Sequence, residues 1–524
     1  MKRFSVCLLF FSLSFSFVVI GQDYRKESSK KVKTYKAQQE ALIKYLQFRR
    51  DSILQARALP KMDSVSRKTA DDMRAKFLKD RAKADSINHL KYVKLLKNNR
   101  PDTVKVLQLR NGGYTSFPVE ITDFNQLENL VMSSNQISEL PKVLTEFKHL
   151  KILDLSGNKL GGILSEECSM PDIPSLRSLH LDRNKLTTLP KGIEELKKLE
   201  TLSLSRNKLN NSKHSLKIKK STSLRQLDLS SNQLSRIPKK LKKLKNLESL
   251  NLSRNQIKSL KGISKLKKLK SLNLSYNDVF IRPKDFKYLK SLETLTLRDC
   301  KLVYLPETIG LLQNLKKLVI PENYLETLPQ GIGDLQQLQS LMLYKNKLVS
   351  LPKVVSKLQN LRWLDVYYNR LKEVPDVITR LKNLEVLYVS HNQLTNLPES
   401  IGDLPKLEEL YAHNNSLVAL PETLGKLKDL RYLHLQNNLL ANFPESILKL
   451  KNLEELNLAH NQIISFPTDI LALQSLTLFT VNGNPYEVGS SARNNLLILL
   501  EKLEANGVKV KFDLGVQQYK HKGR

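Results

Sequence analysis

One apolar frame, L-x-x-L-x-L-x-x-N-x-L, recurs along most of the chain, as in the segments LKILDLSGNKL and LRSLHLDRNKL. Its asparagine stands at Asn135, Asn158, Asn184, Asn207, Asn232, Asn255, Asn277, Asn323, Asn346, Asn369, Asn392, Asn415, Asn438, Asn461 and Asn484. Gly112 and Cys300 take the same slot in two further units, which makes seventeen units, and from Cys300 onward every step is 23 residues. Such units bury their apolar faces only against their neighbours, so the frame predicts one elongated coil instead of several compact domains.

The frame specifies a short strand, a turn and a covering segment. The leucines of L-x-L alternate, so they point into a core while the residues between them face outward. The asparagine amide both donates and accepts hydrogen bonds, which suits backbone groups where the chain leaves the strand. The stretch that follows, such as LPKGIEELKKL, spaces its Leu and Ile as a helix would. We therefore predict an α/β fold, a curved right-handed solenoid with a parallel sheet on its concave face and an α-helical N-terminal segment.

The full unit, LPxxIxxLxxLxxLxLxxNxL, is seen in LPESIGDLPKLEELYAHNNSL, and it resembles the leucine-rich-repeat (LRR) family. Within that family it is most similar to the Ras-group or scribble-like subclass, which is also common in bacterial exported proteins. The resemblance extends over residues 104–484. It implies that the concave face binds a protein, without naming the partner. Extracellular eukaryotic relatives carry cysteine-rich caps, and this chain departs from them because it has none.

The first 21 residues are typical of a secretory signal. Lys2 and Arg3 precede an apolar stretch from Phe4 to Ile20, and small enough side chains precede a cleavage point before Gln22. An uncleaved membrane anchor is the alternative, because the apolar stretch is near the lower length limit for a bilayer span. No later stretch is long and apolar enough to cross a bilayer. We expect export to the periplasm, the cell surface or the medium, with no transmembrane segment after signal removal.

The sequence divides into four parts at 1–21, 22–100, 101–484 and 485–524. Residues 22–100 are basic and predict two helices broken at Pro60, which would serve as a cap, a dimerisation arm or a tether. Residues 101–484 are the repeat array. Residues 485–524 predict a C-terminal cap, made of the helix ARNNLLILLEKLEANG and the strand VKVKFDL, followed by a basic tail.

No catalytic motif is present in the sequence: G-x-x-x-x-G-K-[ST], G-x-S-x-G, H-E-x-x-H and C-x-x-C are all missing. Cys168 and Cys300 lie several units apart, roughly 25 Å at the spacing of strands, so they are too distant for a disulfide within one chain. Cys300 fills an asparagine slot, which favours a structural role. We predict that the protein is not an enzyme and uses no cofactor.

Aromatic residues gather at outward strand positions of the later units, where the early units carry Ser, Asp and Asn. The outward set is Met342, Tyr344, Trp363, Asp365, Tyr367, Tyr388, Tyr411, His413, Tyr432 and His434, with Tyr368, His391, Asn414 and His460 one step further along. Strands about 4.8 Å apart would align these rings as a stripe. The alternative is that they only pack against cross-strand neighbours. Because the rings cluster in consecutive units, we favour a binding site.

Histidines in this set raise two further hypotheses. His413, His434 and Asp365 share one face, but metal sites need three or four converging ligands, so we predict no metal site; a hydrolase using this cluster is a weak third option. A milder expectation is that binding changes below about pH 6.5, where histidine becomes charged.

Positive charge is concentrated in the first half of the array. Residues 205–290 carry 24 Lys and Arg against 4 Asp and Glu, and segments such as IPKKLKKLKNL (237–247) place most of it on the convex side. That wall could attract anionic surfaces through a sequence-independent electrostatic force. Aromatic residues are not interleaved with these lysines, so no nucleic acid partner is expected.

These patterns lead to one principal hypothesis. We expect an exported binding module whose aromatic concave surface recognises a protein, or a glycan, through Tyr344, Trp363, Asp365, Tyr367, Tyr388, His391, Tyr411, His413, Asn414, Tyr432 and His434. The alternative is an envelope-surface scaffold or adhesin that acts through its basic convex wall.

Overall fold

The structure is a computed structural model, and it describes residues 88, 92, 102–161, 169–212, 223–487 and 489–512. The predicted signal, most of the segment 22–100, Cys168 and the predicted basic tail lie outside these residues. The strands are β1 (Val106–Gln108), β2 (Asn129–Val131), β3 (Ile152–Asp154), β4 (Ser178–His180), β5 (Thr201–Ser203), β6 (Gln226–Asp228), β7 (Ser249–Asn251), β8 (Ser271–Asn273), β9 (Thr294–Thr296), β10 (Lys317–Val319), β11 (Ser340–Met342), β12 (Trp363–Asp365), β13 (Val386–Tyr388), β14 (Glu409–Tyr411), β15 (Tyr432–His434), β16 (Glu455–Asn457), β17 (Leu478–Thr480) and β18 (Lys509–Lys511).

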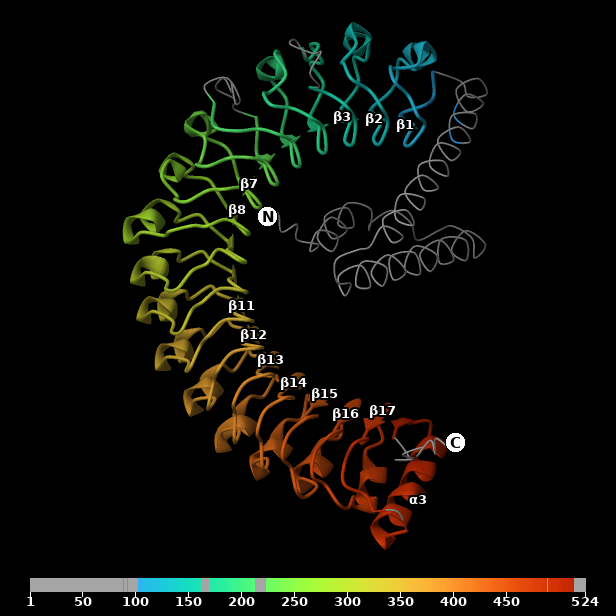
Figure 1. The fold of residues 1–524 in the computed structure, drawn as a ribbon, viewed down its shortest axis with the longest axis vertical. Coiled ribbons are helices and arrows are strands. Elements are labelled where there is room, and N and C mark those ends of the chain that lie inside the picture. The colour runs from blue at the N-terminus through green and yellow to red at the C-terminus, as the bar shows by residue number, and fades with distance from the viewer. Residues whose placement is uncertain are drawn as a thin grey trace, which may run out of the picture. The chain divides into compact units, whose positions relative to one another are not determined.

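The eighteen strands of the described residues form a single sheet, in which each strand pairs in parallel with the next. The register joins equivalent positions of neighbouring units, so that Leu341 faces Leu364 and Leu364 faces Leu387. The repeats curve into an arc with the strands on its inner side (Figure 1). This confirms the predicted solenoid with a parallel sheet on the concave face.

A continuous core runs through the whole array between the sheet and the outer wall. The inward leucines of the frame, such as Leu341, Leu343 and Leu348, have no exposed surface. Burying one leucine side chain contributes about 1.5–3 kcal/mol, and every unit repeats the same inward positions. The core is therefore shared between neighbours, as expected for an array in which no unit can bury its apolar face alone.

The asparagines at the repeating slot of the frame form a buried row, which we call the ladder. Their hydrogen bonds link each unit to the one before it. In Asn346 the amide nitrogen donates to the carbonyls of Ile320 and Leu343, both at 2.9 Å, and Oδ1 accepts from the Leu325 amide at 3.1 Å. Cys300 replaces asparagine here: its thiol lies 3.3 Å from the Leu274 carbonyl oxygen, and burial raises its pKa to about 12. The hydrogen bonds of Asn346 and the burial of Cys300 agree with the structural roles predicted for the ladder asparagines and for Cys300.

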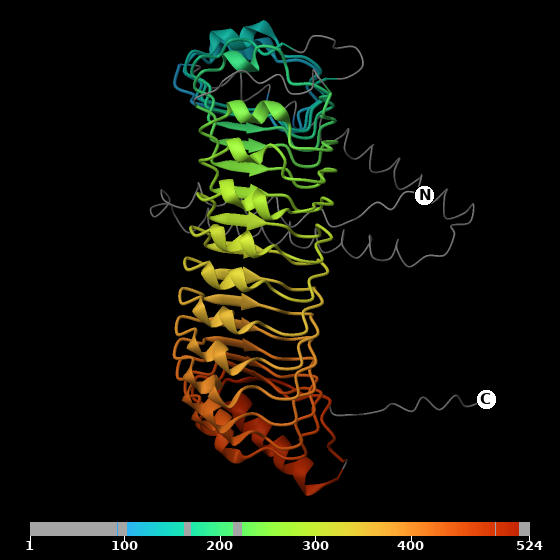
Figure 2. The ribbon, with the colours of Figure 1, turned by 90° about the vertical axis from the view of Figure 1, so that its left-hand side faces the viewer.

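The outer wall is built of 3₁₀ helices, where the Leu and Ile spacing had suggested an ordinary helix. They are η1 (Val119–Asp123), η2 (Lys142–Glu146), η3 (Ile193–Glu195), η4 (Lys239–Lys243), η5 (Ile263–Lys265), η6 (Pro283–Tyr288), η7 (Glu307–Leu311), η8 (Gln330–Asp334), η9 (Lys353–Lys357), η10 (Asp376–Arg380), η11 (Glu399–Asp403), η12 (Glu422–Lys426), η13 (Glu445–Lys449) and η14 (Thr468–Ala472). The proline before most of them is extended, and its carbonyl accepts from the amide three residues on, as Pro306 does from Ile309 at 3.0 Å. Figure 2 shows these helices stacked in one column.

A left-handed turn precedes every ladder position. The residue directly before the ladder slot has a positive φ in all seventeen units, from Asn111 in the first to Gly483 in the last. Glycine and asparagine adopt this conformation readily, whereas other side chains pay a steric cost. The turn nevertheless carries Arg, Tyr and His in several units, including Arg206, Tyr368 and His391.

Described residues outside the repeats contact the array at each end. After Pro485 the chain forms helix α3 (Ser491–Ala505), which buries Leu496, Leu499, Leu500 and Leu503, and β18 then pairs with β17. At the other end, Tyr92 packs against the core and donates a hydrogen bond to the carbonyl of Arg110 at 3.0 Å. Asn88 reaches the carbonyl of Asn111 at 3.2 Å. Two side chains of the predicted N-terminal segment thus contact the first repeat.

Replacing one ladder asparagine should destabilise the array strongly. In Asn346→Ala, buried carbonyls and an amide lose their partners, which should lower the free energy of unfolding by about 2–3 kcal/mol. Urea unfolding followed by circular dichroism measures this loss. Asn360→Ala is the matched control, because Asn360 is exposed and makes one bond, to the Gln336 carbonyl; equal losses in both variants would contradict the role of the ladder.

Candidate binding surface

The predicted aromatic residues lie on the concave face, and four of them form a stack that crosses four strands. Trp363 stacks on Tyr388 with ring centroids 5.5 Å apart, and Tyr388 lies parallel to Tyr411 at 4.3 Å. Tyr411 then meets His434 edge-on at 4.8 Å. We call Trp363, Tyr388, Tyr411 and His434 the ring stack. The stack starts diagonally across the sheet, because Trp363 is the first residue of β12 and Tyr388 is the last residue of β13.

A second cluster lies beside the ring stack, at the turns that follow the strands. Tyr367 contacts the rings of Tyr368 at 5.9 Å, His391 at 4.9 Å and His413 at 6.5 Å. The Asn414 amide lies 2.9 Å from His391 Nε2, and the Ser390 hydroxyl lies 2.8 Å from His413 Nδ1. Tyr368 is 53% exposed, so the cluster offers a ring face to a partner.

Two predicted residues stand apart from both groups. Tyr432 turns to the edge of the sheet, where its hydroxyl donates to Glu454 at 3.1 Å and Arg431 lies 5.3 Å from its ring. Tyr344 has the guanidinium of Arg298 at 5.8 Å from its ring centroid. The structure thus brings together most of the predicted set.

Burial changes the charge states within this surface. Asp365, whose Oδ1 accepts from the Tyr367 amide at 3.0 Å, has its pKa raised by burial to about 6. Burial also raises the pKa of Tyr411, with a further contribution from Tyr388. The Trp363 indole N–H is buried and finds no hydrogen-bond partner in the described part of the chain. At pH 7 the Tyr411 side chain is therefore uncharged, whereas the Asp365 carboxyl is mostly ionised.

The expectation that histidines charge below about pH 6.5 is wrong for this surface. Burial lowers the pKa of His413 to about 4, and neighbouring His391 and His434 act in the same direction. Burial also lowers the pKa values of His391 and His434. Among the residues that the structure describes, no three His, Cys, Asp or Glu side chains are grouped closely enough to hold a metal ion.

Three arginines on the same face escaped the sequence analysis. Arg183, Arg206 and Arg254 occupy the left-handed position before the ladder slot, the same offset at which Tyr368 and His391 were recognised in later units. We call Arg183, Arg206 and Arg254 the arginine row. That shared offset was the signal available in the sequence.

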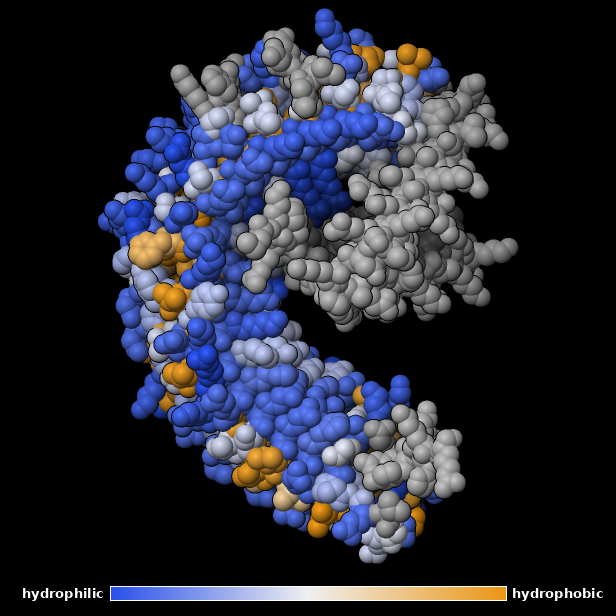
Figure 3. All heavy atoms as spheres, in the orientation of Figure 1, coloured by the Kyte–Doolittle hydropathy of each residue, from blue (hydrophilic) through white to orange (hydrophobic). Residues whose placement is uncertain are grey.

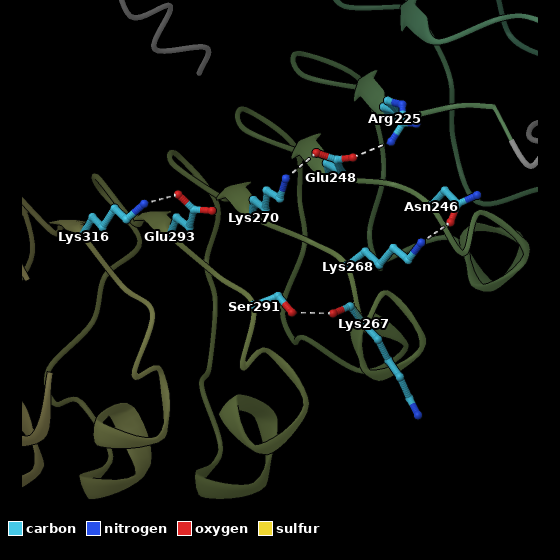
Figure 4. Close-up of polar contacts among 9 residues, drawn as sticks. All are labelled: Arg225, Asn246, Glu248, Lys267, Lys268, Lys270, Ser291, Glu293 and Lys316. Atoms are coloured by element: carbon cyan, nitrogen blue, oxygen red, sulfur yellow. Dashed lines mark hydrogen bonds and ion pairs between the residues drawn. The ribbon is translucent and has the colours of Figure 1, made fainter. Parts of the chain in front are cut away.

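A charged row borders the other edge of the sheet, one residue before each strand. Arg225 and Lys270 both pair with Glu248, at 2.6 and 2.8 Å, and Lys316 pairs with Glu293 at 2.8 Å (Figure 4). These pairs lower the pKa of Glu248, chiefly through the Lys270 hydrogen bond. Exposed ion pairs contribute little stability, so this edge mainly presents balanced charge to solvent.

The convex wall carries the lysines expected there. In η4, Lys239, Lys240 and Lys242 are exposed around the buried Leu241. The visible surface of the array is mainly hydrophilic, with separate apolar residues toward the outer side (Figure 3).

Family models match most of the repeats. A model described as leucine-rich repeat region matches residues 256–347 and 338–430, and one described as leucine rich repeat matches 174–234, 222–279 and 418–485. A third, of the same description, matches 149–170. Together they extend over more than half of the chain. The chain is a leucine-rich-repeat protein.

Solved LRR structures share this fold. An LRR protein of Leptospira interrogans is 29% identical, with a TM-score of 0.55 over 80% of this chain and 98% of that one. An internalin of Listeria monocytogenes is 20% identical, with a TM-score of 0.51 over 66% and 88%. Toll of Drosophila, solved in complex with Spatzle, is 23% identical, with a TM-score of 0.61 over 71% and 53%. The last two likenesses concern the fold alone.

No curated protein matches this LRR chain. Within the described residues, the helices are too short or too polar to cross a bilayer.

Titration of His413 tests the burial of the second cluster. We expect its Hε1 resonance in NMR to titrate near pH 4, because burial lowers its pKa in the folded LRR protein. The imidazole of His413 binds its second proton more tightly in the unfolded chain than in the folded one. Its contribution to the free energy of unfolding therefore decreases as pH falls from about 6.5 to 4. Asp365, with its raised pKa, opposes this change in the same window, because the folded state binds its proton more tightly. A midpoint near 6.5 for His413 would contradict the described packing.

Proposed function

We propose that this protein is an exported LRR binding module that recognises a protein partner through the ring stack and the adjacent Tyr367 cluster. The role includes no catalysis. LRR arrays present extended concave surfaces that serve binding, which supports a macromolecular partner in general terms. A glycan that stacks on the same rings is the closest variant of this proposal.

The continuous contact from Trp363 to His434 is the observation that carries the proposal. Rings that touch at 5.5, 4.3 and 4.8 Å hold one another in fixed rotamers. Because these rings are already ordered before a partner binds, less side-chain entropy is lost on binding, which improves affinity. Cross-strand packing alone would account for the ring contacts, but not for the 53% exposed Tyr368 ring beside them.

Polar groups around the rings would orient the partner. Asn414 is positioned by its contact with His391, and Asp365 by the Tyr367 amide. Because the pKa of Asp365 is about 6, its carboxyl changes charge close to neutral pH. The neutral histidines offer ring nitrogens as donors or acceptors without a charge to desolvate.

Removing two rings of the stack should abolish binding and leave the fold intact. In Trp363→Ala/Tyr388→Ala, loss of two anchors should weaken affinity at least about 30-fold, as expected for hot-spot residues. The measurement is retention of partners by the immobilised protein, followed by titration calorimetry with the partner identified.

Tyr304→Ala/Tyr324→Ala is the matched control, because these tyrosines are exposed at 44% and 47% and lie outside the outward strand positions. The control should retain the partner. If both double variants bind as the unaltered protein does, and added salt alone releases the partner, the basic convex wall is the binding surface and the proposal is wrong.

Export makes a separate prediction. Expression in a bacterial host with a secretion pathway should yield a mature chain that starts at Gln22, because the signal is removed after the small residues that precede it. Intact-mass measurement of the protein recovered outside the cytoplasm reads this directly. A chain that keeps residues 1–21 and sediments with membranes would identify an uncleaved anchor instead.

A further inference from the structure

The arginine row lies along one edge of the concave face, in the fourth, fifth and seventh repeats. Arg183, Arg206 and Arg254 have φ values of 54°, 54° and 55°, and all three directly precede the ladder slot. Strands β4 to β7 pair in register, so Arg183 and Arg206 occupy neighbouring units and Arg254 lies two units further on. Equivalent positions of adjacent units are about 4.8 Å apart, which places three guanidinium groups within reach of one ligand segment.

Placing arginine at these positions has a conformational cost. The same position holds glycine at Gly157 and asparagine at Asn414, residues that adopt left-handed backbone with little strain. Other large side chains also occupy this offset, as at Lys345 and Tyr368, so the arginines are distinguished by their charge and their grouping, and not by the turn.

The guanidinium groups of the row influence one another electrostatically. Burial lowers the pKa of Arg206, and the charges of Arg183 and Arg254 lower it further, with Asp182 acting in the opposite direction. The cations therefore lie close enough to repel one another.

A chain of cation–π contacts leads from the row toward the aromatic residues. The Arg254 guanidinium lies 3.8 Å from the centroid of the Tyr276 ring. Arg298 lies 5.7 Å from the Tyr276 ring and 5.8 Å from the Tyr344 ring. Arg298 is itself held by Glu322, with Nη2 at 2.7 Å from Oε1 and Nε at 3.0 Å from Oε2. The row and the aromatic surface are thus parts of one continuous face.

We infer that the arginine row binds carboxylate side chains on an extended acidic segment of the protein partner, an inference that rests on the proposed function. Guanidinium groups pair with carboxylates through two parallel hydrogen bonds. In an extended segment, successive side chains alternate, so acidic residues can face the row while backbone N–H groups remain available beside it.

Neighbouring carboxylates argue against a uniform polyanion. Asp182 accepts from the Ser205 amide at 2.8 Å, and Asp228 accepts from Asn251 at 3.0 Å, both on the same face as the row. Burial raises the pKa of Asp228, and Asp182 adds to that shift, so the two carboxylates lie close together. A sulfated glycan that carries a negative charge on every unit would be repelled by these carboxylates. A peptide can instead present backbone N–H donors to them.

The test compares two variants with equal loss of charge. Binding of a fluorescein-labelled octapeptide of alternating Glu and Ser is measured by anisotropy with the full chain at low ionic strength. Arg183→Ala/Arg206→Ala/Arg254→Ala should weaken binding at least tenfold. Lys239→Ala/Lys240→Ala/Lys242→Ala removes three exposed charges from the convex wall and should change affinity less than twofold.

A glycine version controls for folding. Arg183→Gly/Arg206→Gly/Arg254→Gly should lose the peptide equally while its melting temperature stays at or above that of the unaltered chain, because glycine suits the left-handed turn. Equal weakening in the arginine and lysine variants, or no binding by the unaltered protein, would overturn the inference. A heparin octasaccharide that loses affinity in the arginine variant, when the peptide does not, would show the ligand class to be wrong.

These outcomes are separable from the proposed function. The arginine variants could still bind the peptide while Trp363→Ala/Tyr388→Ala loses its partner. In that case the inference of an acidic segment is wrong, and the proposed aromatic binding surface is unaffected.

Discussion

The buried asparagine amide is the interaction on which the rest of the array depends. Each amide donates to carbonyls of its own and the preceding unit and accepts from an amide of the preceding unit, as Asn346 does. A buried group with this many partners fixes the backbone turn that surrounds it. Because the same turn is copied from unit to unit, outward residues at equivalent positions line up in straight rows.

Much of the fold follows from patterns that are local in the sequence. Alternating leucines and the ladder slot specify where each strand lies, so seventeen strands could be placed by counting. The outer wall could not be assigned in the same way, because Leu and Ile at helix-like spacing fit both helix types. The choice is made by the short span available within a repeat and by the proline carbonyl, which closes a three-residue turn at positions such as Pro306.

The candidate surface was predictable in position but less so in detail. Counting outward residues placed Trp363, Tyr388 and Tyr411 on the concave face, yet which rings touch depends on side-chain direction across the register. Tyr432 shows this, because it turns to Glu454 and away from the ring stack. The pKa of His413 depends on burial, which no single-residue pattern reveals. The arginine row was missed because early units were considered only to the end of each strand.

Cys300 carries a consequence that reaches beyond its place in the ladder. A thiol that is fully enclosed and holds its proton up to about pH 12 is inert toward alkylating reagents and oxidants while the surrounding repeats stay closed. Its modification therefore requires the ninth repeat to open. The rate at which Cys300 itself is modified would report how often the middle of the solenoid opens locally in the native protein.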